Sequence, residues 1–197
     1  TLLLEHPRYA DKLDARQIEL FIYSNNPYDD HISEALAGLI PNWRNVHGVS
    51  VKKVVDYIRD ENLHILIDLA GHTGYNRLDV FPYRPAPVQV TWLGYPSTTG
   101  VAAMDWLIAD PTGVPEANRW HFTEKVWYVP HTRLCFTPPR TELEVTPLPA
   151  LQNGYVSFGC VQNLTKVTDA ALALWRQILD RVPGAQLRVQ APQFSDM

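Results

Sequence analysis

The chain has 197 residues, of which 46% are hydrophobic and 19% are charged, and its formal net charge at pH 7 is -4. This composition supplies enough apolar material for a packed core and argues against a largely disordered chain. A slight negative charge provides no broad positive field, so we expect no nucleic-acid partner. Because there is neither an apolar run of about 18 residues nor a signal-peptide pattern, we expect a soluble, cytoplasmic protein without membrane contact.

The first 130 residues alternate short apolar runs with segments of helical period. Strands are expected at 18–24, 64–71, 88–95, 104–110 and 124–130, and helices at about 30–39 and 50–61. This alternation is typical of stacked βα units and predicts an α/β fold with a mostly parallel sheet. The run 64–71 is almost entirely apolar, so we expect it to be a central strand that helices cover on both faces.

Residues 131–152 are rich in Pro and Thr, which predicts a linker between a domain at 1–130 and a second domain at 153–197. The second domain is expected to contain a strand, a helix capped by Thr168, and another strand. The apolar stripe of this helix, from Leu172 to Leu179, is expected to be buried. One strand–helix–strand unit cannot cover both faces of a sheet, so we expect this domain to be incomplete in the chain.

The segment CVQNLTKV joins a predicted strand to the predicted helix. Lys166 is expected in the first turn of that helix and Asn163 in the loop before it. Free backbone N–H groups and the helix dipole would favour an anion such as a diphosphate there, with Lys166 as the charged partner. No glycine-rich fingerprint is present, so an ordinary loop with an exposed lysine fits the pattern as well.

Two further polar loops follow predicted strands, at 70–74 and at 93–100. Ligands of open α/β sheets collect at the carboxyl ends of the strands, so His72 and Thr73 are expected to face a cleft. A histidine there could act as a general base or donate a hydrogen bond. The alternative is that His72 only closes its own loop, and Asp68 could either position it or satisfy backbone groups. The loop 93–100 could equally line the cleft or form a simple turn.

A metal site is not expected. Asp29, Asp30 and His31 resemble a patch for a divalent cation, but acidic residues at a helix start more often interact with the helix dipole. The sequence contains no motif of a zinc protease, serine hydrolase or nucleoside triphosphatase. We therefore expect neither a metal nor another cofactor.

Several segments together resemble glycosyltransferase family 41, the family of O-GlcNAc transferases and SPINDLY proteins. They are HILIDLAGHT, RPAPVQVTWLGYPSTTG, MDWLIAD, EKVWYVPHT, FGCVQNLTKVT and LWRQILDRVPGAQL, within residues 62–190. The resemblance implies the GT-B architecture of two Rossmann-like lobes with parallel sheets, the second lobe incomplete here. It also implies inverting, metal-independent transfer of a sugar from a nucleotide-sugar donor to Ser or Thr of an acceptor protein or peptide, with tetratricopeptide repeats upstream.

The resemblance also assigns roles to individual residues. Lys166 matches the family lysine that holds the donor diphosphate and stabilises the leaving nucleotide, and Asn163 falls on a polar position of the donor site. Thr73, Gly94 and Pro96 match residues that line the donor and acceptor cleft. His72 lies between them and is, with Lys166, a candidate catalytic residue.

The family's first strand with its histidine-bearing loop, and its nucleoside-binding strands, do not match any part of the chain. The resemblance therefore implies that the chain alone is inactive or depends on a second chain. UDP-GlcNAc is the expected donor because it is the commonest in the family. The sequences of the segments LAGHT and QNLTK are closer to the SPINDLY branch of the family. This resemblance implies an alternative function, a protein O-fucosyltransferase with GDP-fucose as donor. A non-catalytic scaffold module is the other alternative.

Overall fold

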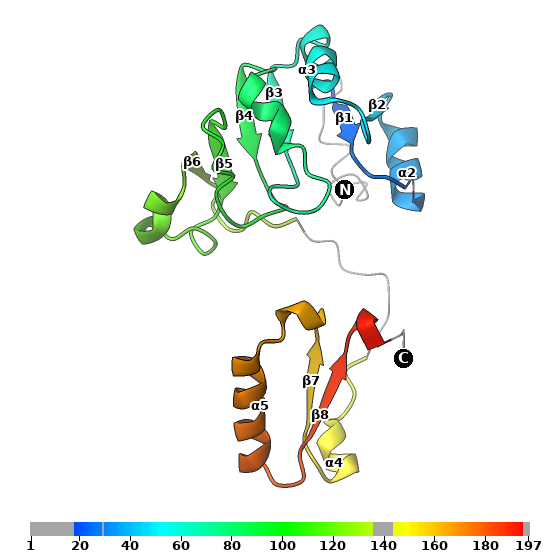
Figure 1. Ribbon diagram of the computed structural model, residues 1–197, viewed down its shortest axis with the longest axis vertical. Helices are drawn as coiled ribbons and strands as arrows, with labels where there is room; N and C mark the ends of the chain where they lie inside the picture. Colours follow the sequence, from blue (N-terminus) through cyan, green and yellow to red (C-terminus); the bar gives the residue numbers. More distant parts are fainter. Residues whose placement is uncertain (1–17, 29, 136–143, 195–197) are drawn as a thin grey trace. The chain divides into compact units, whose positions relative to one another are not determined.

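The computed structural model describes residues 18–28, 30–135 and 144–194 and divides into two compact units, Thr1–Pro138 and Pro139–Met197 (Figure 1). All strand pairs of the described residues are parallel. The predicted α/β class with parallel sheets is therefore confirmed. The division between the units falls within the segment 131–152 that the sequence predicts to be a linker.

The described residues of the first unit contain six strands. Its elements in chain order are β1 (Phe21–Ser24), α2 (His31–Leu39), β2 (Asn42–Asn45), α3 (Val51–Asp60), β3 (Ile65–Asp68), the 3-10 helix η1 (Leu78–Tyr83), β4 (Val88–Thr91), β5 (Trp106–Ala109), the 3-10 helix η2 (Glu116–His121) and β6 (Lys125–Tyr128). β1 pairs with β2, and the other strands form a sheet in the order β3-β4-β5-β6. The sequential order of this larger sheet places consecutive strand ends beside one another.

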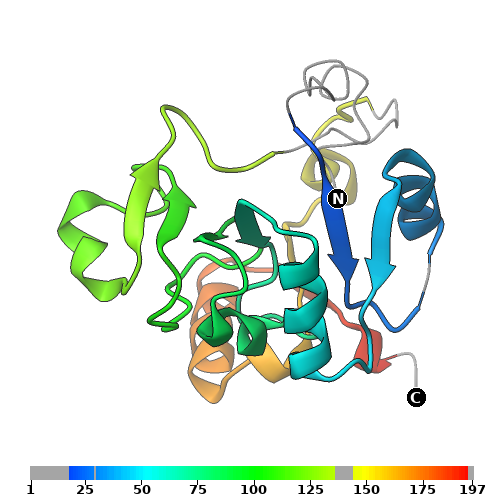
Figure 2. The same ribbon diagram turned by 90° about the horizontal axis from the view of Figure 1, so that it is seen from above.

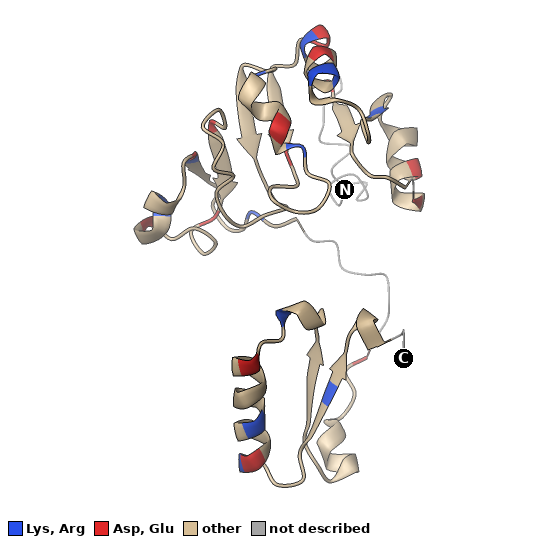
Figure 3. Cartoon of the chain, in the orientation of Figure 1, with Lys and Arg blue, Asp and Glu red and all other residues tan. Residues whose placement is uncertain are grey.

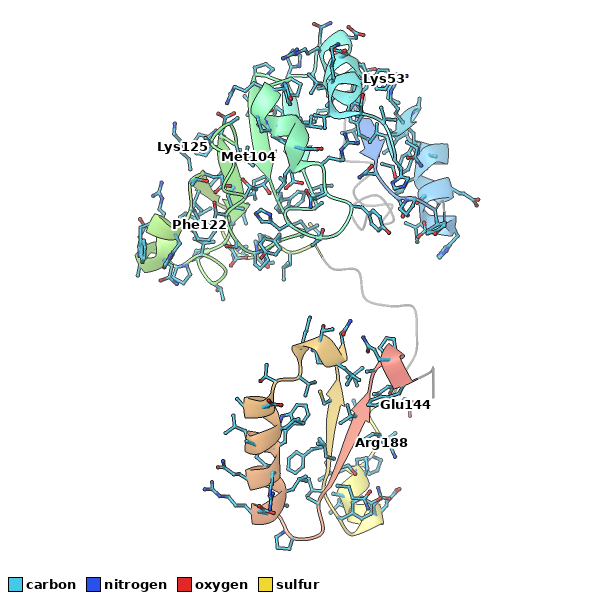
Figure 4. The ribbon with its side chains drawn as sticks, in the orientation of Figure 1. Lys53, Met104, Phe122, Lys125, Glu144 and Arg188 are labelled. Atoms are coloured by element: carbon cyan, nitrogen blue, oxygen red, sulfur yellow. The ribbon has the colours of Figure 1, made fainter. Side chains whose placement is uncertain are left out.

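The main core of the first unit lies between α3, η1 and the larger sheet. Val54, Val55 and Ile58 fall on one face of α3 and are each only 2% exposed, as the helical period predicts. They belong to a cluster with residues of β3, η1 and the loops around them: Val46, Leu66, Leu78, Val80, Phe81, Ala86 and Met104, of which Met104 is labelled in Figure 4. α3 and η1 contact each other and lie on the same side of the sheet (Figure 2).

Two features of the first unit differ from the prediction. β2 was not predicted, because its sequence NWRN has neither apolar alternation nor an apolar run. β3 was expected to be central, yet among the described strands it is at the edge of its sheet. Its side chains alternate, and Ile65 and Ile67 are 55% and 46% exposed on the face away from α3. The described residues thus cover only one face of this strand.

The second unit is a smaller α/β arrangement. Its elements are α4 (Pro149–Asn153), β7 (Ser157–Val161), the 3-10 helix η3 (Leu164–Lys166), α5 (Asp169–Arg181), β8 (Gln186–Gln190) and the 3-10 helix η4 (Pro192–Phe194). The hydroxyl of Thr168 accepts a hydrogen bond from the N–H of Ala171, so Thr168 caps α5 as predicted. α4 forms at the end of the segment that the sequence predicts to be a linker.

The predicted burial of the α5 stripe is wrong for the described residues. Leu172, Leu174 and Ile178 are all about half exposed, and no α5 side chain is buried in that part of the chain. Two strands offer too little surface to cover a helix of this length. The exposed faces of α5 carry both signs of charge (Figure 3). None of the described helices is both long and apolar enough to cross a bilayer.

The core of the first unit makes a prediction for stability. Ile58→Ala should lower the free energy of unfolding by about 2–5 kcal/mol, because it leaves a cavity between α3 and the sheet. Lys52→Ala on the exposed side of the same helix should cost only about 0.5 kcal/mol, since it removes one exposed ion pair with Asp56. Urea unfolding followed by tryptophan fluorescence measures both. Equal losses would contradict the assigned core.

Candidate functional site

The candidate site of the first unit is formed by two loops that follow neighbouring parallel strands. Asp68 at the end of β3 is in register with Thr91 at the end of β4. The N–H of Trp92 donates to the carbonyl of Asp68 at 2.9 Å, so the strand pairing continues into the loops. The loops 69–77 and 92–101 therefore start side by side at one edge of the sheet, where ligands of open α/β sheets bind.

The two loops touch through their glycines. A Cβ atom at Gly94 would overlap the carbonyl oxygen of Leu69, and one at Gly71 would overlap the Cβ of Tyr95. Gly71 also has a φ of +55°, in the left-handed region that favours glycine. Each loop therefore contains a glycine because the other loop lies against it.

This contact brings predicted site residues together. The ring of His72 meets the ring of Tyr95 edge to face, with 5.3 Å between the centroids and 79° between the planes. The hydroxyl of Thr73 donates to the carbonyl of Ala70 at 2.8 Å. His72 and Thr73 are exposed on the first loop, and Gly94 and Pro96 are exposed on the second. Four of the predicted residues thus lie on two adjoining loops of one unit.

Asp68 is the buried acceptor beneath the first loop. Its side chain accepts hydrogen bonds from the N–H groups of Ala70 and Gly71 at 3.0 Å each and from the hydroxyl of Thr91 at 2.8 Å. Within the described residues its bonds go to the backbone and to Thr91, and none goes to the ring of His72. The sequence left two roles open for Asp68, and its direct contacts are those of a residue that satisfies backbone groups.

Glu124 holds the second loop in the same way. It is buried, and its carboxylate accepts hydrogen bonds from the hydroxyl of Thr98 at 2.7 Å, from the N–H of Thr99 at 2.7 Å, and from the hydroxyl of Thr99. Burial alone would raise the pKa of Glu124, but the hydrogen bonds from Thr99 and Thr98 outweigh it and hold the pKa below its usual value. The loop that carries Gly94 and Pro96 is therefore fixed at its far end by a charged acceptor.

Arg133 holds the start of the second loop, a role that no sequence pattern predicts. Its guanidinium donates to the carbonyl of Leu93 at 3.0 Å, and its own carbonyl accepts from the indole N–H of Trp92 at 3.0 Å. Leu93 has a φ of 72°, which is unusual for a residue with a side chain. The N–H of Arg133 in turn donates to Asp110, and this bond is the main cause that lowers the pKa of Asp110. Arg133 lies in the predicted linker but is bound to the first unit.

Lys166 and Asn163 lie in the turn between β7 and α5 of the second unit. Lys166 is in η3, ahead of the Thr168 cap, and not in the first turn of α5 as predicted. The N–H groups of Thr165 and Lys166 donate within the turn, to the side-chain and backbone oxygens of Asn163 at 3.0 Å each. These donors are therefore engaged, and the exposed ammonium group of Lys166 is the cationic group that this turn offers to an anion.

Two other charged groups of the first unit have structural partners. The carboxylate of Asp30 accepts from the N–H and hydroxyl of Ser33, so it caps α2; Asp29 lies outside the described residues. Arg84 forms a bidentate ion pair with Asp105, in which its two terminal nitrogens donate to the two carboxylate oxygens. Among the residues that the structure describes, no three His, Cys, Asp or Glu side chains are grouped as metal ligands would be.

Two α/β units with parallel sheets, and polar loops at the strand ends of the first unit, are features of the GT-B class of protein. A family model described as glycosyl transferase family 41 matches residues 8–137. The chain belongs to this family.

Curated relatives and a solved structure agree with that assignment. Proteins named as probable UDP-N-acetylglucosamine–peptide N-acetylglucosaminyltransferase SPINDLY are similar to 77% of this chain, with 42% identity for Petunia hybrida and 40% for Arabidopsis thaliana. The chain spans only 16% and 17% of their lengths. A lysine-to-methionine mutant of the Thermobaculum terrenum O-GlcNAc transferase has a TM-score of 0.80 at 35% identity, over 90% of this chain and 34% of that one.

The contact between the loops predicts a difference between two glycines. Gly94→Ala should destabilise the first unit by about 1–3 kcal/mol, because the added methyl group overlaps the backbone of Leu69. Gly74→Ala should change stability by less than about 0.5 kcal/mol, since nothing lies within 4 Å of its Cβ position. Urea unfolding gives the stabilities, and hydrogen exchange should rise at residues 69–73 in the first variant alone. No difference between the variants would exclude the close contact.

The lowered pKa of Glu124 predicts a pH dependence. Its contribution to stability is present above the unfolded-state pKa of about 4.3 and is lost as the pH falls through the lower folded-state value. Glu124→Gln should therefore be less stable than the wild type by about 1–3 kcal/mol at pH 7, and the gap should narrow below about pH 4. Urea unfolding at several pH values measures this difference in stability, with Glu34→Gln at an exposed position as control. A difference that does not change with pH would contradict the lowered pKa of Glu124.

Proposed function

We propose that the chain is part of the catalytic region of a protein O-glycosyltransferase that transfers a sugar from a nucleotide-sugar donor to Ser or Thr of a protein. The observation that carries this proposal is the match to the family over residues 8–137 together with the geometry of His72, Thr73, Gly94 and Pro96. Loops at the carboxyl ends of parallel strands are where such a fold binds its ligands. A cytoplasmic location is part of the proposal.

UDP-N-acetylglucosamine is the proposed donor and a peptide segment the proposed acceptor. The support is the name of the relatives, including a Caenorhabditis elegans UDP-N-acetylglucosamine–peptide N-acetylglucosaminyltransferase with 46% identity over 41% of this chain. GDP-fucose is the second candidate. It is favoured by the resemblance of LAGHT and QNLTK to the SPINDLY branch of the family.

Lys166 is proposed to bind the donor diphosphate. Its ammonium group is exposed in η3 and forms no ion pair with the described residues. A lysine is a flexible point charge that can follow the negative charge that builds up on the leaving diphosphate as its bond to the sugar breaks. Asn163 supports this role by holding η3 in shape, since its side-chain oxygen accepts from the N–H and the hydroxyl of Thr165.

The proposed reaction is a single displacement with inversion. The oxygen of the acceptor hydroxyl attacks the anomeric carbon, the bond from that carbon to the diphosphate oxygen breaks, and the hydroxyl proton leaves to a base or to water. His72 is our candidate for this proton transfer, because its imidazole is exposed and Tyr95 restricts its orientation. We propose that no metal takes part, since the lysine supplies the positive charge.

The test compares Lys166→Ala with the wild type of the complete polypeptide that contains this chain. Transfer to peptide is measured with UDP-GlcNAc and with GDP-fucose as donors. Lys166→Ala should lower kcat by about 100-fold or more, because it removes transition-state charge stabilisation. Lys52→Ala on the exposed face of α3 serves as the matched control and should keep full activity.

The outcomes separate the candidates. Turnover of UDP-GlcNAc that Lys166→Ala abolishes supports the first proposal, and turnover of GDP-fucose alone supports the second. A wild type that binds a nucleotide sugar but turns over neither would point to a non-catalytic scaffold module. Full activity of Lys166→Ala would refute the role of the lysine.

A further inference from the structure

Asp68 is placed to control the loop that carries His72 and Thr73. It is the last residue of β3 and only 5% exposed. Its two carboxylate oxygens receive bonds from two successive peptide groups of the loop and from the Thr91 hydroxyl on the neighbouring strand. One side chain thus fixes both the first peptide units of the loop and their position relative to β4.

The first path from Asp68 leads to Thr73. The N–H of Gly71 donates to Asp68 at 3.0 Å, and the carbonyl of Ala70, which belongs to the same peptide unit, accepts from both the N–H of Thr73 at 3.2 Å and its hydroxyl at 2.8 Å. A small tilt of this Ala70–Gly71 peptide unit would therefore move the Thr73 hydroxyl. Hydrogen bonds in series of this kind transmit orientation as well as satisfy polar groups.

The second path leads to His72. Asp68 holds the N–H of Gly71, while the Cα of Gly71 faces the side chain of Tyr95 without room for a Cβ. His72 follows directly, and its ring rests edge-on against the ring of Tyr95. The contacts of the backbone before His72 and of the ring beside it therefore both restrict the imidazole.

We propose that Asp68 is a positioning residue for the transfer reaction, which fixes the Thr73 hydroxyl and the His72 imidazole through the peptide units of Ala70 and Gly71. The inference rests on the function proposed above. Asp68 is not expected to touch donor or acceptor, because its oxygens are engaged and buried. Reacting groups that are held slightly out of place slow the reaction more than they weaken substrate binding. A substitution of Asp68 should therefore lower kcat more than it changes KM.

The experiment uses a graded series in the complete polypeptide that contains this chain. Asp68→Asn keeps the size but replaces an acceptor oxygen with an NH₂ donor that faces an N–H or hydroxyl donor, and kcat should fall about 10- to 100-fold. KM for the donor should change less than about 3-fold. Thr91→Val removes one hydrogen bond to the carboxylate and should give a smaller fall in kcat. Thr91→Ser keeps the hydroxyl and should have the kcat of the wild type.

Two controls separate positioning from folding. Ile58→Ala destabilises the same unit from its core, and well below its melting temperature it should keep the wild-type kcat. Asp30→Asn makes the same substitution at the cap of α2 and should also be neutral. Hydrogen exchange should rise at the amides of Ala70 and Gly71 in Asp68→Asn but not in either control.

The outcomes distinguish this inference from the proposed function. If the wild type transfers sugar and Asp68→Asn keeps kcat within about 2-fold, the inference is wrong while the function stands. A fall in kcat that Ile58→Ala reproduces would likewise reduce Asp68 to a structural residue. A wild type that is inactive with both donors refutes the proposed function, and the role of Asp68 falls with it.

Discussion

The parallel register of β3 and β4 is the constraint on which the candidate site depends. It places Asp68 opposite Thr91, so a carboxylate and a hydroxyl meet where both strands end. It also brings the backbone of Gly94 against the carbonyl of Leu69. A shift by one residue would turn Asp68 to the other face of the sheet and separate these groups. The geometry of the loops is thus decided in the sheet before either loop begins.

The elements with a clear period were predictable from the sequence. α3 has a single apolar stripe, and the runs at β3, β4, β5 and β6 were predicted as strands in the right order. β2 could not be predicted, because strand formation there depends on pairing with β1 and not on its own polar residues. The expected burial of β3 on both faces failed for a similar reason. An apolar run predicts a strand, but which faces are covered depends on segments elsewhere in the chain.

The positions of the two loops were predictable, and what holds them was not. Polar residues and glycines after apolar runs predicted loops at 70–74 and 93–100, and these loops do follow β3 and β4. Their supports come from far along the chain: Glu124 bonds Thr98 across 26 positions, and Arg133 bonds Leu93 across 40. Such pairings leave no local pattern in a single sequence, whereas the support by Asp68 spans two or three positions and was weighed as an alternative.

The carboxylates near the two loops are hydrogen-bonded to the protein, which is compatible with an anionic donor in the proposed function. Asp68, Glu124 and Asp110 lie beneath or beside the loops, and their oxygens accept bonds from N–H and hydroxyl groups, so their charge is directed into the protein. Bare carboxylates at the loop tips would repel a diphosphate. The turn before α5 shows the opposite arrangement, because its backbone donors are engaged with Asn163 while the ammonium of Lys166 is left exposed. In the proposed function each unit therefore has its own part: buried carboxylates shape the loops of the first unit, and in the second unit an exposed ammonium group can balance the charge of a nucleoside diphosphate.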